Sequence, residues 1–339
     1  MSEKSELLGK RADGIVFSPG QVGQQTIKAI QDAKDNPDLL HWGVPQLDDH
    51  FVMMRHSRFI GLLGDTGMGK STLMKILLNN VAGQLKDDEI AVHFTWEESV
   101  EDFGMSMLAP TALVAVGSLF HGTTTEKEMQ RVLEQAGKLS GKPLWVVGHS
   151  DMSDKRRPRM TITDVELVME YLVDVQKKKI RLATFDYLQR INTNDTKQDD
   201  VRLSFVQIVD RIKDIALQYK PVVVVASQIK RGVQARKWRQ PQIHDAQETS
   251  NFEQTADGMV SVWMPYKSDN WTNGESVIEK KNVTDTAVSV SPDLLMIETI
   301  KQKKRKAPEL RAVDLLPEYS RIVAYGKAAT ERKFIQESL

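Results

Sequence analysis

Apolar residues follow two kinds of spacing along the first two thirds of the chain. Continuous apolar runs of strand length occur at 59–63, 90–94, 144–147, 180–186 and 221–228. Apolar residues three or four positions apart, the spacing of a helix with one buried face, occur at 72–85, 127–139, 163–176 and 205–219. The spacing from Thr163 to Glu166 also matches a capping box, which predicts a helix start there. Strands that alternate with helices in this way predict a parallel sheet covered by helices.

The last third of the chain has a different pattern. Strand-like segments follow one another without intervening helices at 258–263, 294–300, 310–316 and 321–325, and a polar insertion fills 267–289. Several of these segments alternate apolar and polar residues, as antiparallel strands do. We therefore expect an α/β fold in which a mainly parallel central sheet, flanked by helices, carries added antiparallel strands. One domain is expected over 41–326, after a flexible segment at 1–24 and a linker helix at 25–40, and before a tail at 327–339.

A glycine-rich loop joins the run at 59–63 to the helix-like segment 72–85. Its sequence is Gly64-Asp65-Thr66-Gly67-Met68-Gly69-Lys70-Ser71. Glycines let backbone N–H groups turn inward around phosphates, and the helix N-terminus near Thr72 adds partial positive charge. Lys70 is placed to reach the β- and γ-phosphates, and the Ser71 hydroxyl to bind Mg²⁺. The motif predicts a site for ATP and Mg²⁺ to which residues 64–72 contribute.

Three of the strand-like runs end in side chains suited to nucleotide hydrolysis. Glu97 follows the run at 90–94 and is the predicted base that orients the attacking water, with Glu98 as the alternative. Asp186 closes the run at 180–186, where a carboxylate can hold a water of the metal. Gln228 ends the run at 221–228, where a neutral amide can bind the γ-phosphate and report its loss.

A basic segment follows Gln228. Its five cations are Lys230, Arg231, Arg236, Lys237 and Arg239, with Trp238 among them. Lys and Arg contact nucleic-acid phosphates without reading the base sequence, so these cations are candidate DNA-binding residues. A solvated loop has the same composition, and composition alone favours that reading.

The composition limits the kinds of partner and chemistry. Forty-six basic and 46 acidic residues give a formal net charge of zero, so any nucleic-acid site has to be a local patch. The absence of cysteine excludes disulfides, thiol catalysis and cysteine-bound zinc. No apolar run reaches the roughly 20 residues that span a bilayer, and the first residues do not resemble a signal peptide. An intracellular protein without a membrane partner is expected.

Together these segments resemble the RecA-like ATPase domain of the DnaB-type hexameric replicative helicases, including the helicase halves of phage primase-helicases. The matching segments are Trp42-Gly43-Val44-Pro45, the phosphate loop, Phe94-Thr95-Trp96-Glu97-Glu98-Ser99, Asp186-Tyr187-Leu188-Gln189, Ser227-Gln228 and 248–257. The most specific of them is Asp186-Tyr187-Leu188-Gln189. The resemblance covers about residues 25–326 and implies a RecA-like phosphate-loop fold.

The resemblance also implies a function. Members of this family hydrolyse ATP and unwind duplex DNA while moving along single-stranded DNA, usually 5′ to 3′. They form homohexamers with ATP at each subunit interface and DNA-binding loops in the central channel, here near 192–201 and 230–239. A cytoplasmic location in a bacterial cell or a phage-infected host follows.

The position that acts on the neighbouring subunit departs from the family pattern. The family's Lys-x-Arg aligns with Lys301-Gln302-Lys303, so Lys303 takes the place of the arginine finger and Lys301 that of the first lysine. Arg305 is the alternative finger, because it faces the same side of an extended strand. The resemblance leaves this choice open.

Other departures leave the partners and the activity open. Only about 40 residues precede the expected domain, so the family's separate N-terminal domain is not expected, and contact with a primase or helicase loader is undecided. The glycine of the family's Glu-Ser-Gly segment is not preserved, which weakens the assignment of Glu248 and Glu253 as structural acids. The residues also fit a RecA- or KaiC-like ATPase that forms a DNA-binding filament or a regulatory ring without unwinding activity.

Overall fold

The structure is a computed structural model. It describes residues 16–35, 39–48, 54–153, 160–192, 201–230, 232–233, 236–246, 250–268, 274–280, 285–303 and 309–338. The chain forms two compact units, Met1–Leu39 and Leu40–Leu339.

In the first unit, the helix α2 (Pro19–Asp35) begins before residue 25, where the linker helix is expected. The Ser18 N–H donates to Gln21 Oε1 (2.8 Å), and the Gln21 N–H donates to Ser18 Oγ (3.4 Å). This reciprocal pair, followed by Pro19 in the first helical position, fixes the start of the helix.

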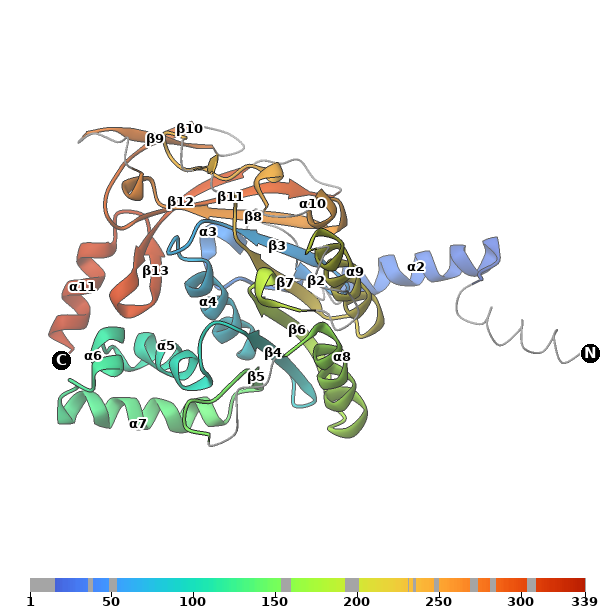
Figure 1. The fold of residues 1–339 in the computed structure, drawn as a ribbon, viewed down its shortest axis with the longest axis horizontal. Helices are drawn as coiled ribbons and strands as arrows, with labels where there is room; N and C mark the ends of the chain where they lie inside the picture. The colour runs from blue at the N-terminus through green and yellow to red at the C-terminus, as the bar shows by residue number, and fades with distance from the viewer. Residues whose placement is uncertain are drawn as a thin grey trace, which may run out of the picture. The chain divides into compact units, whose positions relative to one another are not determined.

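The second unit is built on one large sheet (Figure 1). Its strands are β3 (Phe59–Leu63), β4 (Glu89–Thr95), β5 (Leu144–Val147), β6 (Lys179–Asp186), β7 (Val222–Ser227), β8 (Gly258–Trp263), β11 (Leu294–Gln302), β12 (Glu309–Leu316) and β13 (Arg321–Ala324). Within the described residues the order is β13-β12-β11-β8-β3-β7-β6-β4-β5. The strands from β8 to β5 are parallel, and β11, β12 and β13 are antiparallel additions. This confirms the expected fold class.

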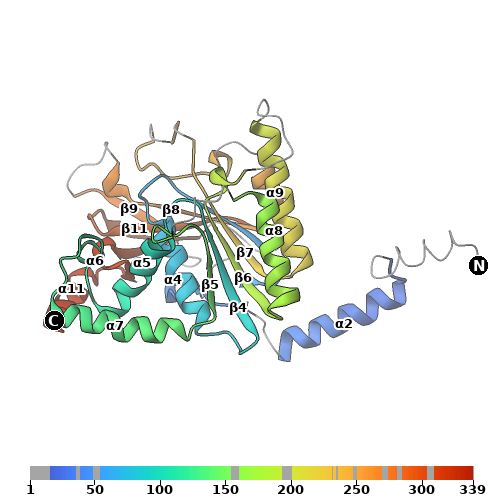
Figure 2. The same cartoon turned by 60° about the horizontal axis from the view of Figure 1, so that its bottom comes forward.

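Helices cover both faces of the parallel strands. The principal ones are α4 (Lys70–Ala82), α5 (Val100–Ala112), α6 (Val116–His121), α7 (Glu126–Ser140), α8 (Ile162–Glu170) and α9 (Val201–Gln218). Figure 2 shows α8 and α9 on one side of β4, β6 and β7, and α4, α5 and α7 on the other. Shorter helices are α3 (Pro45–Asp48) and α10 (Ser250–Thr255).

Alternate residues of the parallel strands enter two separate cores. In β3, Ile60 and Leu62 pack in the core that contains α4, whereas Phe59 and Leu63 pack in the core that contains α9. The valines of β7 divide in the same way. Because both faces of these strands are buried, their sequences are continuously apolar rather than alternating.

The start of α8 contradicts the capping box expected at Thr163. Thr161 is the N-cap: its N–H donates to Asp164 Oδ2 (2.6 Å), and the Asp164 N–H donates to Thr161 Oγ1 (3.4 Å). Thr163 and Glu166 instead accept hydrogen bonds from Arg211 of α9, at 2.9 and 2.8 Å. The spacing of a capping box therefore occurs twice in this segment, at Thr161 to Asp164 and at Thr163 to Glu166. The first pair caps α8, and the second pair binds Arg211 of α9.

Several elements have no counterpart in the sequence pattern. The strands β9 (Ser276–Lys280) and β10 (Asp285–Ser289) form a hairpin inside the expected polar insertion, where Val277 and Val288 pack on Trp263. The expected tail contains α11 (Ala328–Glu337), and Ile335 of this helix is fully buried. The helices α5 and α6 also went unpredicted, and α5 has Pro110 in its interior. Among the side chains that the structure describes, the buried apolar ones are Val277 and Val288 in the hairpin and Ala328 and Ile335 in α11. With so few buried positions, the apolar periodicity of these elements is weak.

Candidate functional site

The loop between β3 and α4 has a backbone conformation that requires glycine. Gly67 and Gly69 have positive φ angles of 72° and 87°, which residues with a Cβ adopt only with strain. A Cβ on Gly64 would lie 2.8 Å from the carbonyl oxygen of Val262 in β8. α4 begins at Lys70, directly after Gly69. The sequence therefore places a helix N-terminus immediately after a glycine turn, which is an arrangement suited to bind phosphate.

Lys70 lies in a mostly buried position inside this loop. Its Nζ donates to the carbonyl oxygens of Gly64 and Asp65, both at 2.8 Å. Burial lowers the pKa of Lys70, while the carboxylates of Asp186, Asp65 and Glu97 oppose that shift. The ammonium group therefore lies where acidic side chains from three separate segments converge.

A cavity of about 310 Å³ collects residues from distant parts of the chain. It is lined by Thr66, Gly67, Gly69, Lys70, Ser71, Thr72, Glu97, Asp186, Tyr187, Gln228, Lys267, Leu315 and Pro317. The strands β3, β7, β6 and β4 are consecutive in the sheet, and the carboxyl ends of parallel strands meet at one edge. For this reason Glu97, Asp186 and Gln228 come together with the phosphate loop. Of the predicted loop residues, Gly64, Asp65 and Met68 do not line the cavity.

The two neighbouring glutamates after β4 have different surroundings. Glu97 is exposed and lines the cavity. Glu98 turns toward α4, where Lys75 Nζ donates to its Oε2 at 2.7 Å. Burial raises the pKa of Glu98, and the charge of Lys75 and its hydrogen bond oppose that shift. Only Glu97 therefore faces the space that a nucleotide would occupy.

Gln189 connects the ends of β6 and β7. Its Nε2 donates to Ser227 Oγ (2.9 Å), and its Oε1 accepts from the Gln228 N–H (3.2 Å). The amide of Gln189 thus fixes the backbone from which the Gln228 side chain enters the cavity. Both end residues of the Asp186-Tyr187-Leu188-Gln189 segment therefore contribute to the site. Asp186 lines the cavity, and Gln189 holds the backbone of Gln228.

The cavity contains residues that the sequence pattern did not identify. Lys267 Nζ donates to the carbonyl oxygen of Gly67 in the phosphate loop. Leu315 lies in β12, Pro317 follows the last residue of that strand, and Tyr187 follows Asp186. Lys267 lies in the stretch expected to be a polar insertion, and no local signal separates it from the other lysines.

The basic segment divides into cations with different partners. Arg236 makes a two-point ion pair with Asp245, with Nη2 to Oδ1 at 3.0 Å. Lys230 is exposed and donates to the His244 carbonyl oxygen (3.2 Å). Lys237 has 54% of its side chain exposed and pairs with Glu275 (3.0 Å). Arg239 is partly buried.

Arg231 lies outside the described residues, as does 193–200 of the other expected DNA-binding loop. Within the part of the basic segment that the structure describes, Lys230 and Lys237 are therefore the most accessible cations, whereas Arg236 holds the segment to Asp245.

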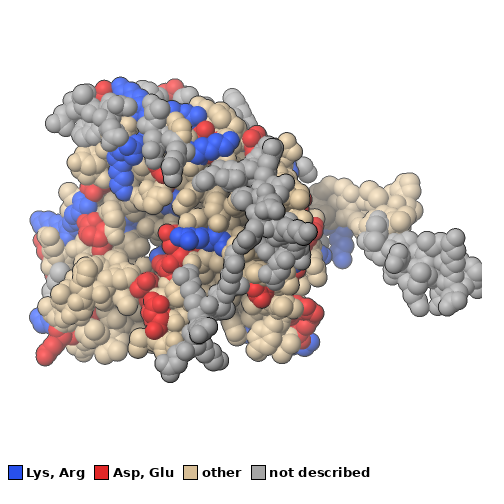
Figure 3. Space-filling view, in the orientation of Figure 1, with Lys and Arg blue, Asp and Glu red and all other residues tan. Residues whose placement is uncertain are grey.

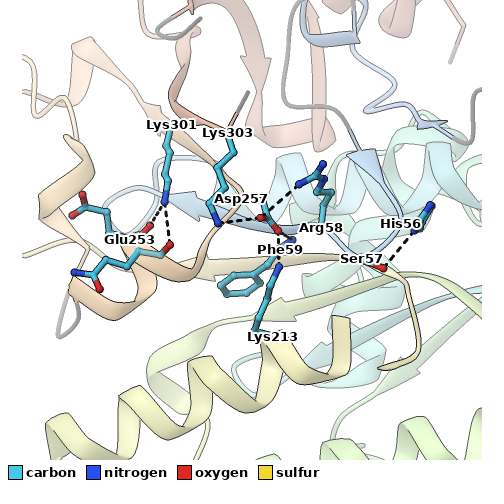
Figure 4. A network of polar contacts seen from close by, with 10 residues as sticks. His56, Ser57, Arg58, Phe59, Lys213, Glu253, Asp257, Lys301 and Lys303 are labelled. Atoms are coloured by element: carbon cyan, nitrogen blue, oxygen red, sulfur yellow. Dashed lines mark hydrogen bonds and ion pairs between the residues drawn. The ribbon is translucent and has the colours of Figure 1, made fainter. Parts of the chain in front are cut away.

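Lys301 and Lys303 are not among the residues that line this cavity. Lys301 Nζ donates to the carbonyl oxygens of Glu253 and Gln254. Lys303 has 43% of its side chain exposed, and its Nζ donates to Asp257 Oδ1 (3.2 Å; Figure 4). Arg305, the alternative finger, and Glu248 lie outside the described residues.

The described residues also limit other kinds of site. Among them, no helix is both long and apolar enough to cross a membrane. They likewise contain no group of three or more His, Asp or Glu side chains that could hold a metal ion.

Curated proteins with similar sequences are replicative helicases. The chain is 23% identical over 253 residues to the replicative DNA helicase DnaC of Bacillus subtilis (strain 168), which covers 75% of this chain and 53% of that protein. It is 24% identical over 265 residues to the replicative DNA helicase DnaB of Geobacillus stearothermophilus, with coverage of 75% and 54%. The chain thus spans about half the length of the curated relatives it matches.

Solved structures share the fold. One, described as an ATPase domain, has a TM-score of 0.70 at 15% identity and covers 90% of this chain and 99% of its own. Another, a DnaB-like replicative helicase described with its primase interactions, has a TM-score of 0.68 at 16% identity, with coverage of 94% and 70%. A family model for the DnaB-like helicase C-terminal domain matches residues 40–315. Because this match spans most of the chain, the chain belongs to the DnaB-like helicase C-terminal domain family.

Proposed function

We propose that this chain is the motor domain of a hexameric replicative DNA helicase. Hydrolysis of Mg-ATP would drive its movement along single-stranded DNA and separate the duplex. The observation that carries the proposal is the convergence of the phosphate loop, Glu97, Asp186 and Gln228 on one cavity. Membership in the family, whose curated relatives are named replicative DNA helicases, favours this function over a filament-forming or regulatory ATPase.

In the proposed hydrolysis, each of the cavity residues has a different role. Lys70 and the loop amides stabilise the charge that develops on the phosphates. Glu97 orients the attacking water and accepts its proton. Gln228 donates a hydrogen bond to the γ-phosphate and loses that contact after cleavage. Thr66, Gly67 and Gly69 line the cavity and would surround the phosphates.

The residues present fit a magnesium ion. Ser71 and Asp186 supply the hydroxyl and carboxylate oxygens that Mg²⁺ prefers, and both line the cavity. Because the described residues contain no self-sufficient cluster of metal ligands, nucleotide phosphates and water would complete the coordination. When bound, the ion would neutralise charge on the β- and γ-phosphates.

We assign Lys301, Lys303 and Arg305 to the ATP of a neighbouring subunit. Lys301 and Lys303 do not line their own cavity, and Lys303 is accessible. A lysine lacks the planar fork with which arginine binds a phosphate at two points. If Lys303 is the trans-acting cation, we expect slower turnover than in an enzyme with an arginine at this position.

Contact with single-stranded DNA is assigned to the basic segment. Lys230 and Lys237 are accessible, and Arg231 and Arg239 complete the candidate set. Arg236 acts through Asp245, by holding the segment in place. The same proposal includes a motor domain over 41–326, translocation from 5′ to 3′ and a cytoplasmic location. It also includes a primase or helicase loader as partner.

ATP hydrolysis and unwinding of a forked duplex test the proposal. We expect Lys70→Ala and Glu97→Gln to lower kcat about 10²-fold or more, because each removes a group that acts in the transition state. Glu98→Gln is the matched control, since it removes the adjacent carboxylate that faces Lys75. Equal losses in Glu97→Gln and Glu98→Gln, with equal melting temperatures, would show that the base is wrongly assigned. ATP hydrolysis without any unwinding would reject the helicase.

A further inference from the structure

Asp257 lies at a junction of three parts of the second unit. It precedes the first residue of β8, and 10% of its side chain is exposed. Its Oδ2 accepts from the Phe59 N–H (3.0 Å) and from Lys213 Nζ (2.7 Å). Its Oδ1 accepts from Lys303 Nζ (3.2 Å; Figure 4). One carboxylate therefore contacts the start of β3, a lysine of α9 and the residue that follows β11.

Main-chain hydrogen bonds reinforce the same junction. The Asp257 N–H donates to the Phe59 carbonyl oxygen (2.7 Å), and the Lys303 N–H donates to the Asp257 carbonyl oxygen (2.9 Å). Phe59 is the first residue of β3, and β3 leads directly into the phosphate loop at Gly64. The segment that holds Lys303 is thus hydrogen-bonded, through a single residue, to the strand that supports this subunit's own phosphate loop.

The junction carries more positive than negative charge. Among the described residues around Asp257, Figure 4 shows Arg58, Lys213, Lys301 and Lys303. Arg58 lies 3.7 Å from the carboxylate. Burial lowers the pKa of Lys301, and the charge of Lys303 lowers it further, while the carboxylates of Glu253 and Asp257 oppose that shift. A partly exposed cluster with unbalanced positive charge is suited to approach an anion supplied by another molecule, such as a nucleotide polyphosphate.

We propose that Asp257 is a positioning residue that holds Lys303 for the neighbouring subunit's nucleotide and connects it to the phosphate loop of its own subunit. The proposal rests on the function proposed above. The physical basis is the contact between the Asp257 carboxylate and Lys303 Nζ, because the bonds of the same carboxylate to Phe59 and Lys213 fix its position.

Mixtures of variant subunits test this proposal. The acceptor, Lys303→Met, keeps its phosphate loop but has no lysine to offer a neighbour. The donor, Lys70→Ala, lacks a working site of its own but keeps Lys303. In mixed rings the donor restores ATP turnover at the acceptor sites. A second donor, Lys70→Ala with Asp257→Asn, is expected to restore about tenfold less, because its Lys303 is no longer held.

The design separates positioning from a general structural role. The second donor's own site is already inactive, so damage to its phosphate loop cannot lower the restored turnover. The matched control donor combines Lys70→Ala with Glu134→Gln, which neutralises an exposed acid on α7 that pairs with Lys138. This control is expected to restore turnover as well as Lys70→Ala alone. The KM for ATP at the acceptor sites is expected to stay unchanged, since the cation acts on the transition state.

Each outcome decides between the proposals. Equal restoration by the donors with and without Asp257→Asn overturns the positioning role of Asp257. If Lys303→Met keeps full turnover, the trans-acting role of Lys303 fails, and that result is distinct from a failure of Asp257. If Asp257→Asn does not fold, Asp257→Glu keeps the charge and displaces Lys303 by one methylene. Full restoration by the Asp257→Glu donor also overturns the proposal.

Discussion

At the residue scale, burial determines the protonation state of a histidine in β4. His93 of β4 is 1% exposed and stacks on Phe103, with ring centroids 4.7 Å apart. Its Nδ1 shares a hydrogen bond with Thr184 Oγ1 (2.7 Å). Burial, with a smaller contribution from the charge of Lys75, lowers the pKa of His93 to about 3. The folded protein therefore keeps this imidazole neutral across the mildly acidic range.

This environment predicts a specific loss of stability in acid. Below the ordinary pKa of 6.5, the unfolded chain binds a proton at His93 that the folded chain does not bind. The free energy of unfolding should therefore fall by about 1.4 kcal/mol per pH unit from pH 6.5 toward pH 3. Between about pH 7.5 and pH 5, His93→Gln should lose about 2 kcal/mol less than the wild type in urea unfolding. The same pH dependence in both proteins would contradict the prediction.

At the element scale, charged contacts attach helices that bury little apolar surface. The N-terminal residues of α11 are held by Asp314, whose Oδ2 accepts from the N–H groups of Lys327 (2.9 Å) and Ala328 (3.0 Å). Arg332, in the middle of the helix, donates twice to Asp293, both at 2.7 Å, and once to Glu318 at 2.6 Å. These contacts compensate for the small apolar face of the helix.

Removal of the arginine should loosen α11 without unfolding the whole unit. Arg332→Leu leaves Asp293 and Glu318 without this cation, and we expect the free energy of local opening of α11 to fall by about 1–2 kcal/mol. Amide hydrogen exchange of residues 328–337 should become correspondingly faster. Lys333→Leu is the control, because Lys333 lies on the same helix with 76% of its side chain exposed. Equal exchange rates in Arg332→Leu and Lys333→Leu would argue against this attachment.

At the scale of the whole molecule, neutral net charge means that the proposed affinity for DNA would have to come from a few local cations. Figure 3 shows basic and acidic side chains mixed over one face, with basic side chains more frequent in its upper half. The accessible cations of the basic segment, Lys230 and Lys237, are the candidates for direct contact. Each phosphate contact releases bound counterions, so the number of contacts can be counted from the salt dependence.

The slope of log affinity for single-stranded DNA against log salt concentration should change with these lysines. We expect Lys230→Gln and Lys237→Gln each to reduce the slope by about 0.7, the value for one phosphate contact on a single strand. Lys138→Gln on α7, a cation with 60% of its side chain exposed, should leave the slope unchanged. If all three variants reduce the slope equally, binding is not confined to the basic segment.

The sequence by itself determined those features of the fold and the site that depend on neighbouring residues in the chain. The glycines of the phosphate loop predict a backbone with positive φ angles. The continuous valines of β7 predict a strand that is buried on both faces. Glu97, Asp186 and Gln228 could be predicted because each lies at a strand end, and parallel strands bring their carboxyl ends to one edge. The order of these segments along the chain supported the resemblance to the helicase family.

Only the tertiary structure decided questions that depend on distant partners. The sequence favours Glu97 over the adjacent Glu98, and the structure shows the contact that distinguishes them, because Lys75 of α4 pairs with Glu98. Arg236 and Lys237 are adjacent, but Asp245 engages the first at two points and leaves the second more accessible. Lys267 reaches the phosphate loop, and Asp257 joins β3 to Lys303, through contacts between segments far apart in the chain. Periodicity reports which face of an element is buried, but it does not report which side chain lies opposite.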